Sequence, residues 1–328
     1  MKIAGTQVQA GEKSFVRLKA TESHARFDAD VPLHVVRGAA DGPTLVVQAG
    51  LSGLEIEPAM VLPGVVEALD PERLRGTLVV VPLFNTVGFE FEQVNAAWDD
   101  KDLHTLGRGQ AGGSVSQELV HAYYEQVVAH ADALIDVRTG SQWGYYRYAG
   151  VYDTVSLAAS RALALDLDLP QVLIGEPAAH GIAAEAARDG KAVVSAWIGG
   201  GPGLRDYREQ DMGRIQRAVM NALKHLGMLD GAPDRHEQRE VAVVQAHSVL
   251  RPSGERGFTF VDKTKRGHAV AQGERIGIVR HPFTGDVVQE ITAPKAGVML
   301  HAGASWPVVP EGFILAIIGD LVETVTLS

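Results

Sequence analysis

The chain has 328 residues, of which 46% are hydrophobic and 21% charged, a composition typical of a globular protein with a sizeable core. Its 40 acidic residues exceed its 30 basic ones, which argues against a general nucleic-acid binder, because affinity for phosphate needs clustered Lys and Arg. The lack of cysteine excludes disulfides, thiolate zinc sites and a cysteine nucleophile. Since no apolar run is long enough to cross a bilayer or act as a signal segment, we expect a cytoplasmic protein without a membrane partner.

The first 229 residues alternate between apolar runs and helical patterns. Residues 1–40 are β-rich, with a plausible strand at residues 31–38, and could join either part of the molecule. Continuous apolar runs, typical of strands buried on both faces, follow at residues 44–50, 76–85, 133–137 and 192–200. Apolar residues at helical spacing occupy residues 60–69, 114–128, 153–167, 182–189 and 211–226. This alternation predicts an α/β domain whose sheet is mostly parallel and flanked by helices.

The pattern changes after a polar stretch at residues 228–240. Short strand-like segments with Gly and Pro turns, and no helical period, predict a small all-β domain at residues 240–328. Residues 270–278 are weakly similar to residues 309–317, which suggests a compact barrel-sandwich of two hairpin units. We therefore expect two domains, residues 1–229 and residues 240–328.

Small and polar residues follow four of the predicted strands, where open α/β sheets bind their ligands. These junctions are at residues 50–55, 84–88, 136–140 and 196–201. A charged loop at residues 99–109 adds His104. An aromatic group after the third junction could line a pocket or pack against another domain; it consists of Trp143, Tyr145, Tyr146 and Tyr148.

The residues at these junctions form recognisable motifs. Residues 50–55 read Gly-Leu-Ser-Gly-Leu-Glu, residues 82–85 read Pro-Leu-Phe-Asn, residues 136–138 read Asp-Val-Arg, and residues 197–200 read Trp-Ile-Gly-Gly. In order and spacing, over nearly the whole chain, they resemble the succinylglutamate desuccinylase and aspartoacylase family, which has a zinc-carboxypeptidase-like fold. The corresponding family motifs are Gly-x-His-Gly-x-Glu, Pro-x-x-Asn, Asp-Leu-His and Glu-x-Gly-Gly.

The resemblance implies hydrolysis of the amide bond in N-acyl amino-acid-like substrates by a zinc ion with three protein ligands. It places Glu55 at a retained ligand position, and Ser52 and Arg138 at the two His ligand positions. It also places His104 within a substrate-binding Asn-Arg pair, and Trp197 at the general base. Catalytic zinc needs about three His or carboxylate ligands, and a guanidinium stays protonated. We therefore expect a divergent deacylase that has lost the usual zinc centre and carries no cofactor.

Three other interpretations stay open. The chain could be a non-catalytic small-anion-binding or regulatory protein on the same fold. It could be a metal-independent serine hydrolase, because Ser52 follows a strand and precedes a helix as a nucleophile can, with His104 as the base. It could also be a metalloenzyme with rebuilt ligands, for example Glu55, His104 and a distant histidine.

The candidate residues follow from these interpretations. We predict catalytic roles for Ser52, His104 and Arg138, and substrate binding by Asn85, Arg138 and Trp197. A guanidinium is well shaped to hold a carboxylate or phosphate, so the expected ligand is a small acidic or acylated amino-acid-like molecule. Because an unpaired buried ion is costly, Arg138 is expected to contact Glu55 at the former metal position. The chain could also form a homo-oligomer.

Overall fold

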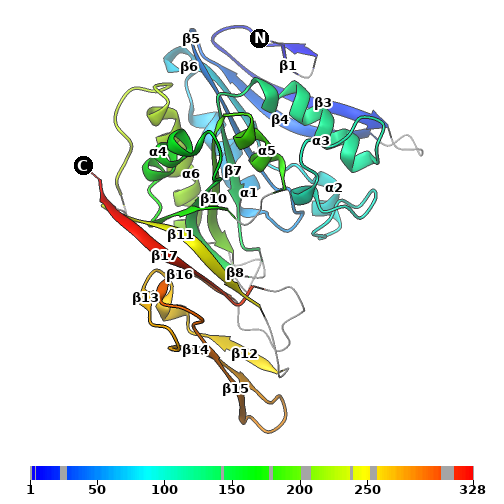
Figure 1. The fold of residues 1–328 in the computed structure, drawn as a ribbon. Coiled ribbons are helices and arrows are strands. Elements are labelled where there is room, and N and C mark those ends of the chain that lie inside the picture. The colour runs from blue at the N-terminus through cyan, green and yellow to red at the C-terminus, as the bar shows by residue number, and fades with distance from the viewer. Residues whose placement is uncertain are drawn as a thin grey trace.

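In the computed structural model, the described residues are 2–3, 5–22, 28–141, 144–176, 180–200, 208–236, 239–251, 257–303 and 314–327. A twelve-stranded mixed sheet runs through the molecule (Figure 1). From one edge to the other its strands are β13 (Ala269–Val270), β16 (Gly297–Gly303), β17 (Ala316–Thr326), β11 (Glu240–Leu250), β9 (Gln171–Ile174), β8 (Gly144–Val151), β10 (Ala192–Gly200), β7 (Ala133–Arg138), β5 (Ala40–Ala49), β6 (Arg75–Val81), β4 (Asp28–Arg37) and β3 (Glu12–Glu22).

The centre of this sheet, from β9 to β6, is mostly parallel, as predicted. Of its five neighbouring pairs, four are parallel, and only β10 and β8 run antiparallel. Its strands are continuous apolar runs because both faces are covered, as in β5, where Leu45, Val46 and Val47 are fully buried.

Helices cover the sheet on both faces. One face packs against α1 (Glu57–Ala68), α4 (Leu157–Asp166) and α6 (Glu209–His225). The other packs against α3 (Val115–Gln126) and α5 (Ile182–Arg188). Side chains alternate along a strand, so in β7 Ile135 belongs to the first core and Leu134 to the second. Asp136 and Arg138 therefore share the α3/α5 face.

Short elements and caps complete this part. They are α2 (Thr86–Glu90), η1 (Pro71–Arg73), η2 (Leu103–Thr105), η3 (Val128–His130), β1 (Lys2–Ile3) and β2 (Thr6–Gln7). The capping box of Ser114 and Gln117 opens α3 as the sequence predicts. Gly227, with φ at 67°, follows the end of α6.

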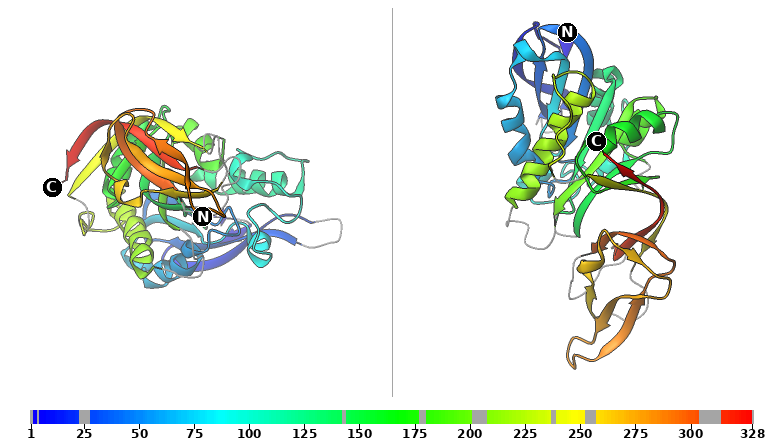
Figure 2. Two further views of the ribbon diagram at one scale, coloured as in Figure 1. Left: turned by 90° about the horizontal axis from the view of Figure 1, so that it is seen from below. Right: turned by 90° about the vertical axis from the view of Figure 1, so that its left-hand side faces the viewer.

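From β11 onward, the regular elements of the described residues are strands, apart from η4 (Lys263–Lys265). A second, antiparallel sheet contains β12 (Phe258–Val261), β14 (Arg275–Arg280) and β15 (Val287–Thr292), and this part projects from one end of the molecule (Figure 2). Other strands of this part belong to the large sheet, because β11 pairs with β9 and β16 pairs with β8. The boundaries at residues 229 and 240 stay predictions, and residues 309–313 of the weak internal similarity lie outside the described residues.

The structure answers one question that the sequence left open, namely where the N-terminal strands belong, and it adds two strands that the sequence did not predict. The N-terminal strands β3 and β4 join the large sheet beside β6. Strands β8 and β9 were not predicted, because β8 is rich in tyrosine and β9 is only four residues long.

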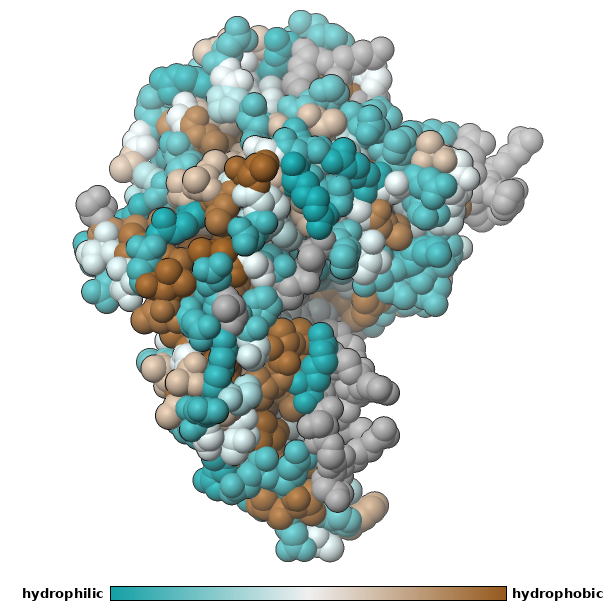
Figure 3. Space-filling view, viewed as in Figure 1, coloured by the Kyte–Doolittle hydropathy of each residue, from teal (hydrophilic) through white to brown (hydrophobic). Residues whose placement is uncertain are grey.

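Apolar side chains are also exposed on the projecting part (Figure 3). Phe283, in the turn between β14 and β15, is 91% exposed, and Leu321 and Val322 of β17 are about half exposed. None of the helices that the structure describes is long and apolar enough to cross a membrane.

Candidate functional site

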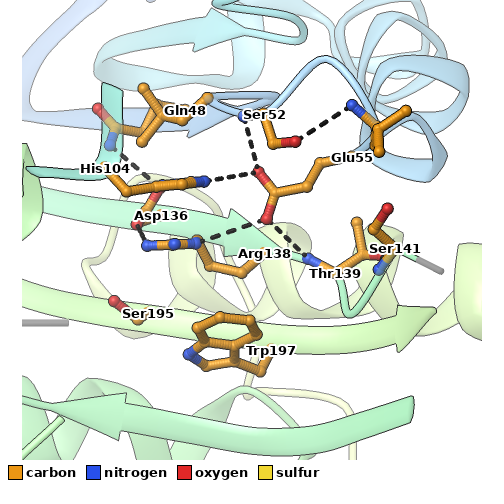
Figure 4. A network of polar contacts seen from close by, with 12 residues as sticks. Gln48, Ser52, Glu55, His104, Asp136, Arg138, Thr139, Ser141, Ser195 and Trp197 are labelled. Atoms are coloured by element: carbon orange, nitrogen blue, oxygen red, sulfur yellow. Dashed lines mark hydrogen bonds and ion pairs between the residues drawn. The ribbon is translucent and has the colours of Figure 1, made fainter. Parts of the chain in front are cut away.

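The candidate residues meet at the carboxyl ends of β5, β7 and β10 (Figure 4). Strand register places Arg138 of β7 beside Trp197 of β10, and Trp197 beside Tyr148 of β8. These side chains form a row on the α3/α5 face. Ligands of open α/β sheets bind at this end of the strands.

A tight loop after β5 carries Ser52 and Glu55. The loop needs small residues: a Cβ atom on Gly53 would lie 2.1 Å from the backbone carbon of Gly88. The amide of Ser52 donates to Oε2 of Glu55 at 3.3 Å, and the amide of Glu55 donates to the carbonyl of Ser52 at 3.1 Å. The Glu55 carboxyl group is thereby fixed in the protein interior, where only 3% of the residue is exposed.

Arg138 lies between two buried carboxyl groups. Its Nε is 3.6 Å from Oε1 of Glu55, and its Nη1 donates to Oδ2 of Asp136 at 3.1 Å. The predicted contact between Arg138 and Glu55 is therefore confirmed, and Asp136 is a second partner. The guanidinium carbon also lies 4.7 Å from the centre of the Trp197 ring, within the range of a cation–π interaction.

A buried chain of hydrogen bonds through Gln48 and Tyr123 fixes the carboxylate of Asp136. Nε2 of Gln48 donates to Oδ1 of Asp136 at 3.0 Å, and the hydroxyl of Tyr123 donates to Oε1 of Gln48 at 3.1 Å. We did not single out Gln48 or Tyr123 from the sequence. The available signal was that Gln48 and Asp136 interrupt otherwise apolar buried strands, where a polar group needs a partner.

His104 approaches Glu55 from η2. Its Nε2 lies 3.6 Å from Oε2 of Glu55, and its side chain is 15% exposed. Burial and the neighbouring Arg138 lower the pKa of His104 well below its usual value, so the imidazole is neutral at pH 7. The pKa of Glu55 is raised to about 7, mainly by burial; Asp136 also raises it, while Arg138 and the backbone amides lower it.

Ser52 does not face His104. Its Oγ accepts a hydrogen bond from the amide of Leu54 at 3.2 Å, and the hydroxyl points away from the imidazole (Figure 4). An activated serine usually has its base within hydrogen-bond reach. The catalytic roles of Ser52 and His104 stay predictions, and this geometry gives them no support.

Thr139, another residue that we did not single out from the sequence, closes the loop over Glu55. Its amide lies 3.4 Å from Oε1 of Glu55, and its hydroxyl donates to Oε2 of Glu57 at 3.1 Å. Burial raises the pKa of Glu57. Like Gln48, Thr139 holds the charged residues in place through hydrogen bonds.

Trp197 forms one wall of the site. Its Nε1 donates to Oε2 of Glu176 at 3.3 Å, and its ring packs 4.9 Å from that of Tyr146. The Tyr146 ring is stacked on His301 of β16, with 3.9 Å between centres. Tyr146 and Tyr148 thus connect the site to the projecting part, while Trp143 lies outside the described residues.

Asn85 is used by the backbone. Its Oδ1 accepts from the amide of Gly88 at 2.9 Å, and its Nδ2 donates to the carbonyls of Leu51 and Val94 at 3.3 Å. These bonds fasten α2 to the Ser52 loop. The substrate-binding role of Asn85 stays a prediction.

These side chains, as placed, do not fit a zinc ion held through Glu55. Arg138 puts a permanent positive charge 3.6 Å from that carboxyl group, and the hydroxyl of Ser52 is turned toward Leu54. Among the described residues, no group of three or more His, Cys, Asp or Glu could hold a metal ion.

Comparisons with known proteins identify the family. The succinylglutamate desuccinylase/aspartoacylase catalytic domain matches residues 41–226, more than half of the chain. The N-alpha-acetyl-L-2,4-diaminobutyric acid deacetylase of Halomonas elongata is 23% identical over 95% of this chain and 92% of its own length.

Solved structures share the fold. A succinylglutamate desuccinylase/aspartoacylase from Rhodobacter sphaeroides superimposes with a TM-score of 0.82 at 20% identity, covering 98% of this chain and all of that one. The product-bound ectoine utilization protein EutE (DoeB) from Ruegeria pomeroyi gives 0.79 at 21% identity, covering 94% and 95% of the two chains. The predicted zinc-carboxypeptidase-like fold is confirmed, and the chain belongs to the succinylglutamate desuccinylase/aspartoacylase family, which includes deacylases of N-acyl amino acids.

Proposed function

We propose that this protein is a divergent member of the family that binds a small acidic or acylated amino-acid-like ligand, and that Arg138 replaces the zinc ion. The observation that carries the proposal is the pairing of one buried guanidinium with both Glu55 and Asp136. Two buried carboxyl groups need positive charge nearby, and Arg138 supplies it where a dication would otherwise be required.

The unused donors of Arg138 support ligand binding. Its Nη1 donates to Asp136, while its Nη2 makes no hydrogen bond to the residues that the structure describes. A guanidinium presents five N–H donors in a fixed plane, so one edge can donate to carboxyl groups of the protein while another donates to a ligand carboxylate. Trp197, stacked on the same guanidinium, limits the direction from which that ligand approaches.

The name of the Halomonas relative suggests the ligand class to test. It acts on an acylated amino acid, a molecule that combines a carboxylate with an amide. In this chain, Arg138 would bind the carboxylate, and the usual zinc-dependent hydrolysis of the amide would be lost. A non-catalytic binding or regulatory role follows if no other group performs the reaction.

The test combines metal analysis with binding and turnover. Purified protein is assayed for metal by mass spectrometry. It is then titrated with N-acetyl-L-2,4-diaminobutyrate, N-acetylaspartate and N-succinylglutamate, with chelator or added zinc. We expect less than stoichiometric zinc, binding of at least one ligand with chelator present, and weaker binding by Arg138→Lys, which keeps the charge but loses the planar fork. Arg73→Ala, an exposed change in η1, serves as the control.

Two results would contradict the proposal. One is stoichiometric zinc that is lost in Glu55→Gln and is required for hydrolysis. The other is a set of ligand affinities that Arg138→Lys leaves unchanged. Metal-free hydrolysis that Ser52→Ala abolishes would instead support the serine-hydrolase interpretation.

A further inference from the structure

A second cluster of charge surrounds Tyr145, at the start of β8. Because side chains alternate along a strand, Tyr145 lies on the same face of the sheet as Ala149, whose side chain belongs to the core under α1, α4 and α6. The cluster therefore lies on the opposite face of the sheet from Arg138. Two guanidinium carbons approach the Tyr145 ring: that of Arg208 at 4.9 Å from its centre, and that of Arg266 at 4.8 Å.

These two arginines come from different parts of the molecule. Arg208 is the N-cap residue of α6, whereas Arg266 follows η4 in the projecting part. The two parts are joined nearby, where Ala302 of β16 pairs with Tyr145 of β8. The cluster thus forms only where both parts meet.

The carboxylate of this cluster is already engaged. Asp211 accepts a hydrogen bond from the Tyr145 hydroxyl at 2.8 Å and forms a buried ion pair with Arg214. Arg214 also donates to the Tyr145 hydroxyl at 3.1 Å. Nη1 of Arg208 donates to the carbonyl of Gly200 at 2.7 Å and lies 3.9 Å from the other oxygen of Asp211, so a carboxylate compensates its charge only weakly.

Arg266 is less well compensated. Its Nη2 makes one long hydrogen bond, 3.4 Å, to the carbonyl of Ala302, and its buried Nε has no hydrogen-bond partner among the described residues. None of the carboxylates in the described part of the chain forms an ion pair with it. Burial lowers the pKa of Arg266, and the positive charges of Arg147 and Arg208 lower it further, although a guanidinium remains protonated near neutral pH.

We propose that Arg208 and Arg266, both beside the Tyr145 ring, form a binding site for a small multivalent oxyanion. The ligand groups that suit it are carboxylate and phosphate, which guanidinium groups bind through paired hydrogen bonds. Access is available, since the side chain of Arg208 is 47% exposed and Arg266 is only partly buried. An anion here would compensate the charges of Arg208 and Arg266, which otherwise repel each other.

The site connects the two parts of the chain. A bound anion would contact Arg208 on one side and Arg266 on the other, so it would strengthen the junction between β8 and β16. A ligand that binds only the folded protein raises its melting temperature. The proposal does not depend on the function proposed for Arg138.

The experiment measures binding of sodium phosphate and of citrate to the full-length protein by calorimetry and thermal melting. Sodium chloride at the same ionic strength corrects for non-specific screening. The variants are Arg266→Gln, Arg208→Gln and the control Arg280→Gln, an exposed residue of β14. We expect the wild type to bind at least one anion and to melt at a higher temperature with it.

The variants separate the proposed site from others. Arg266→Gln and Arg208→Gln should each weaken the affinity about tenfold or more, whereas Arg280→Gln should leave it unchanged. Stronger binding of citrate would identify a carboxylate ligand, and stronger binding of phosphate a phosphoryl ligand. Because Arg208 is half exposed, its variant remains informative if Arg266→Gln fails to fold. No binding beyond the chloride control, or wild-type affinity in folded Arg208→Gln, would overturn the proposal.

Discussion

The arginine side chains on the two faces of the sheet have different partners. On the α3/α5 face, Arg138 lies between Glu55 and Asp136, and Asp136 is itself held by Gln48. On the other face, Arg266 has an aromatic ring and a long carbonyl contact, but no carboxylate among the described residues. The first arrangement is balanced, because carboxylates of the protein offset the positive charge of Arg138. The charge of Arg266 is offset only if another group supplies negative charge.

This difference separates structural from ligand-dependent charge. Removing a member of the balanced set should reduce stability whether or not a ligand is present. Removing a member of the second set should mainly alter the response to anions. The predictions below test the Arg138 cluster and the residues around it, from the largest expected effect to the smallest.

Arg138→Ala should have the largest effect on stability. It leaves Glu55 and Asp136 buried without their cation, and breaking a buried ion pair costs about 3–5 kcal/mol. Denaturant unfolding measures the change, with exposed Arg73→Ala as the control. A loss no greater than that of the control would mean that the ion pairs contribute nothing to the fold.

Asp136→Asn should have a smaller effect because the side chain keeps its shape. Loss of the charged partner of Arg138 should cost about 1–3 kcal/mol. Since Asp136 helps to raise the pKa of Glu55, that pKa should fall below its value of about 7. Carboxyl-carbon NMR titration measures it, and a pKa that does not move would show that the two carboxyl groups are uncoupled.

The pH dependence of stability tests His301 of β16, whose ring is stacked on that of Tyr146. Burial and Arg266 lower the pKa of His301 to about 3, compared with about 6.5 when unfolded. Between these values the unfolded chain binds the extra proton, so the free energy of unfolding falls as pH falls below 6.5, by up to about 1.4 kcal/mol per pH unit.

The matched variant is His301→Phe, which keeps a ring to stack on Tyr146. Urea unfolding at pH values from 4 to 7 should give a flatter dependence for this variant than for the wild type. Parallel curves for the two proteins would mean that His301 titrates normally.

Ser52→Ala should have the smallest effect. Its hydroxyl makes one local hydrogen bond, to the amide of Leu54, and such a bond contributes about 1 kcal/mol. Ligand affinity should remain that of the wild type, because Arg138 and Trp197 are untouched. A selective loss of turnover on N-acyl amino acids, with stability preserved, would instead assign Ser52 a catalytic role.

Much of the fold could be predicted from local patterns. The runs that became β5, β6, β7 and β10 are apolar throughout because they are buried on both faces, and α3 begins at a capping box visible in the sequence. β8 escaped detection because its tyrosines are explained by contacts with Trp197 and His301, which lie far away in the chain. Tertiary neighbours, rather than local propensity, determine that strand.

For the candidate site, the sequence alone determined the family resemblance, the position of Arg138 at a strand end and its expected contact with Glu55. Only the tertiary structure decided that Asp136 shares the guanidinium, that the hydroxyl of Ser52 turns away from His104, and that Arg208 and Arg266 meet at Tyr145. The physical reason is range. Periodicity and motifs report local geometry, whereas the pairing of charges depends on distances between residues that the folded chain brings together from separate elements.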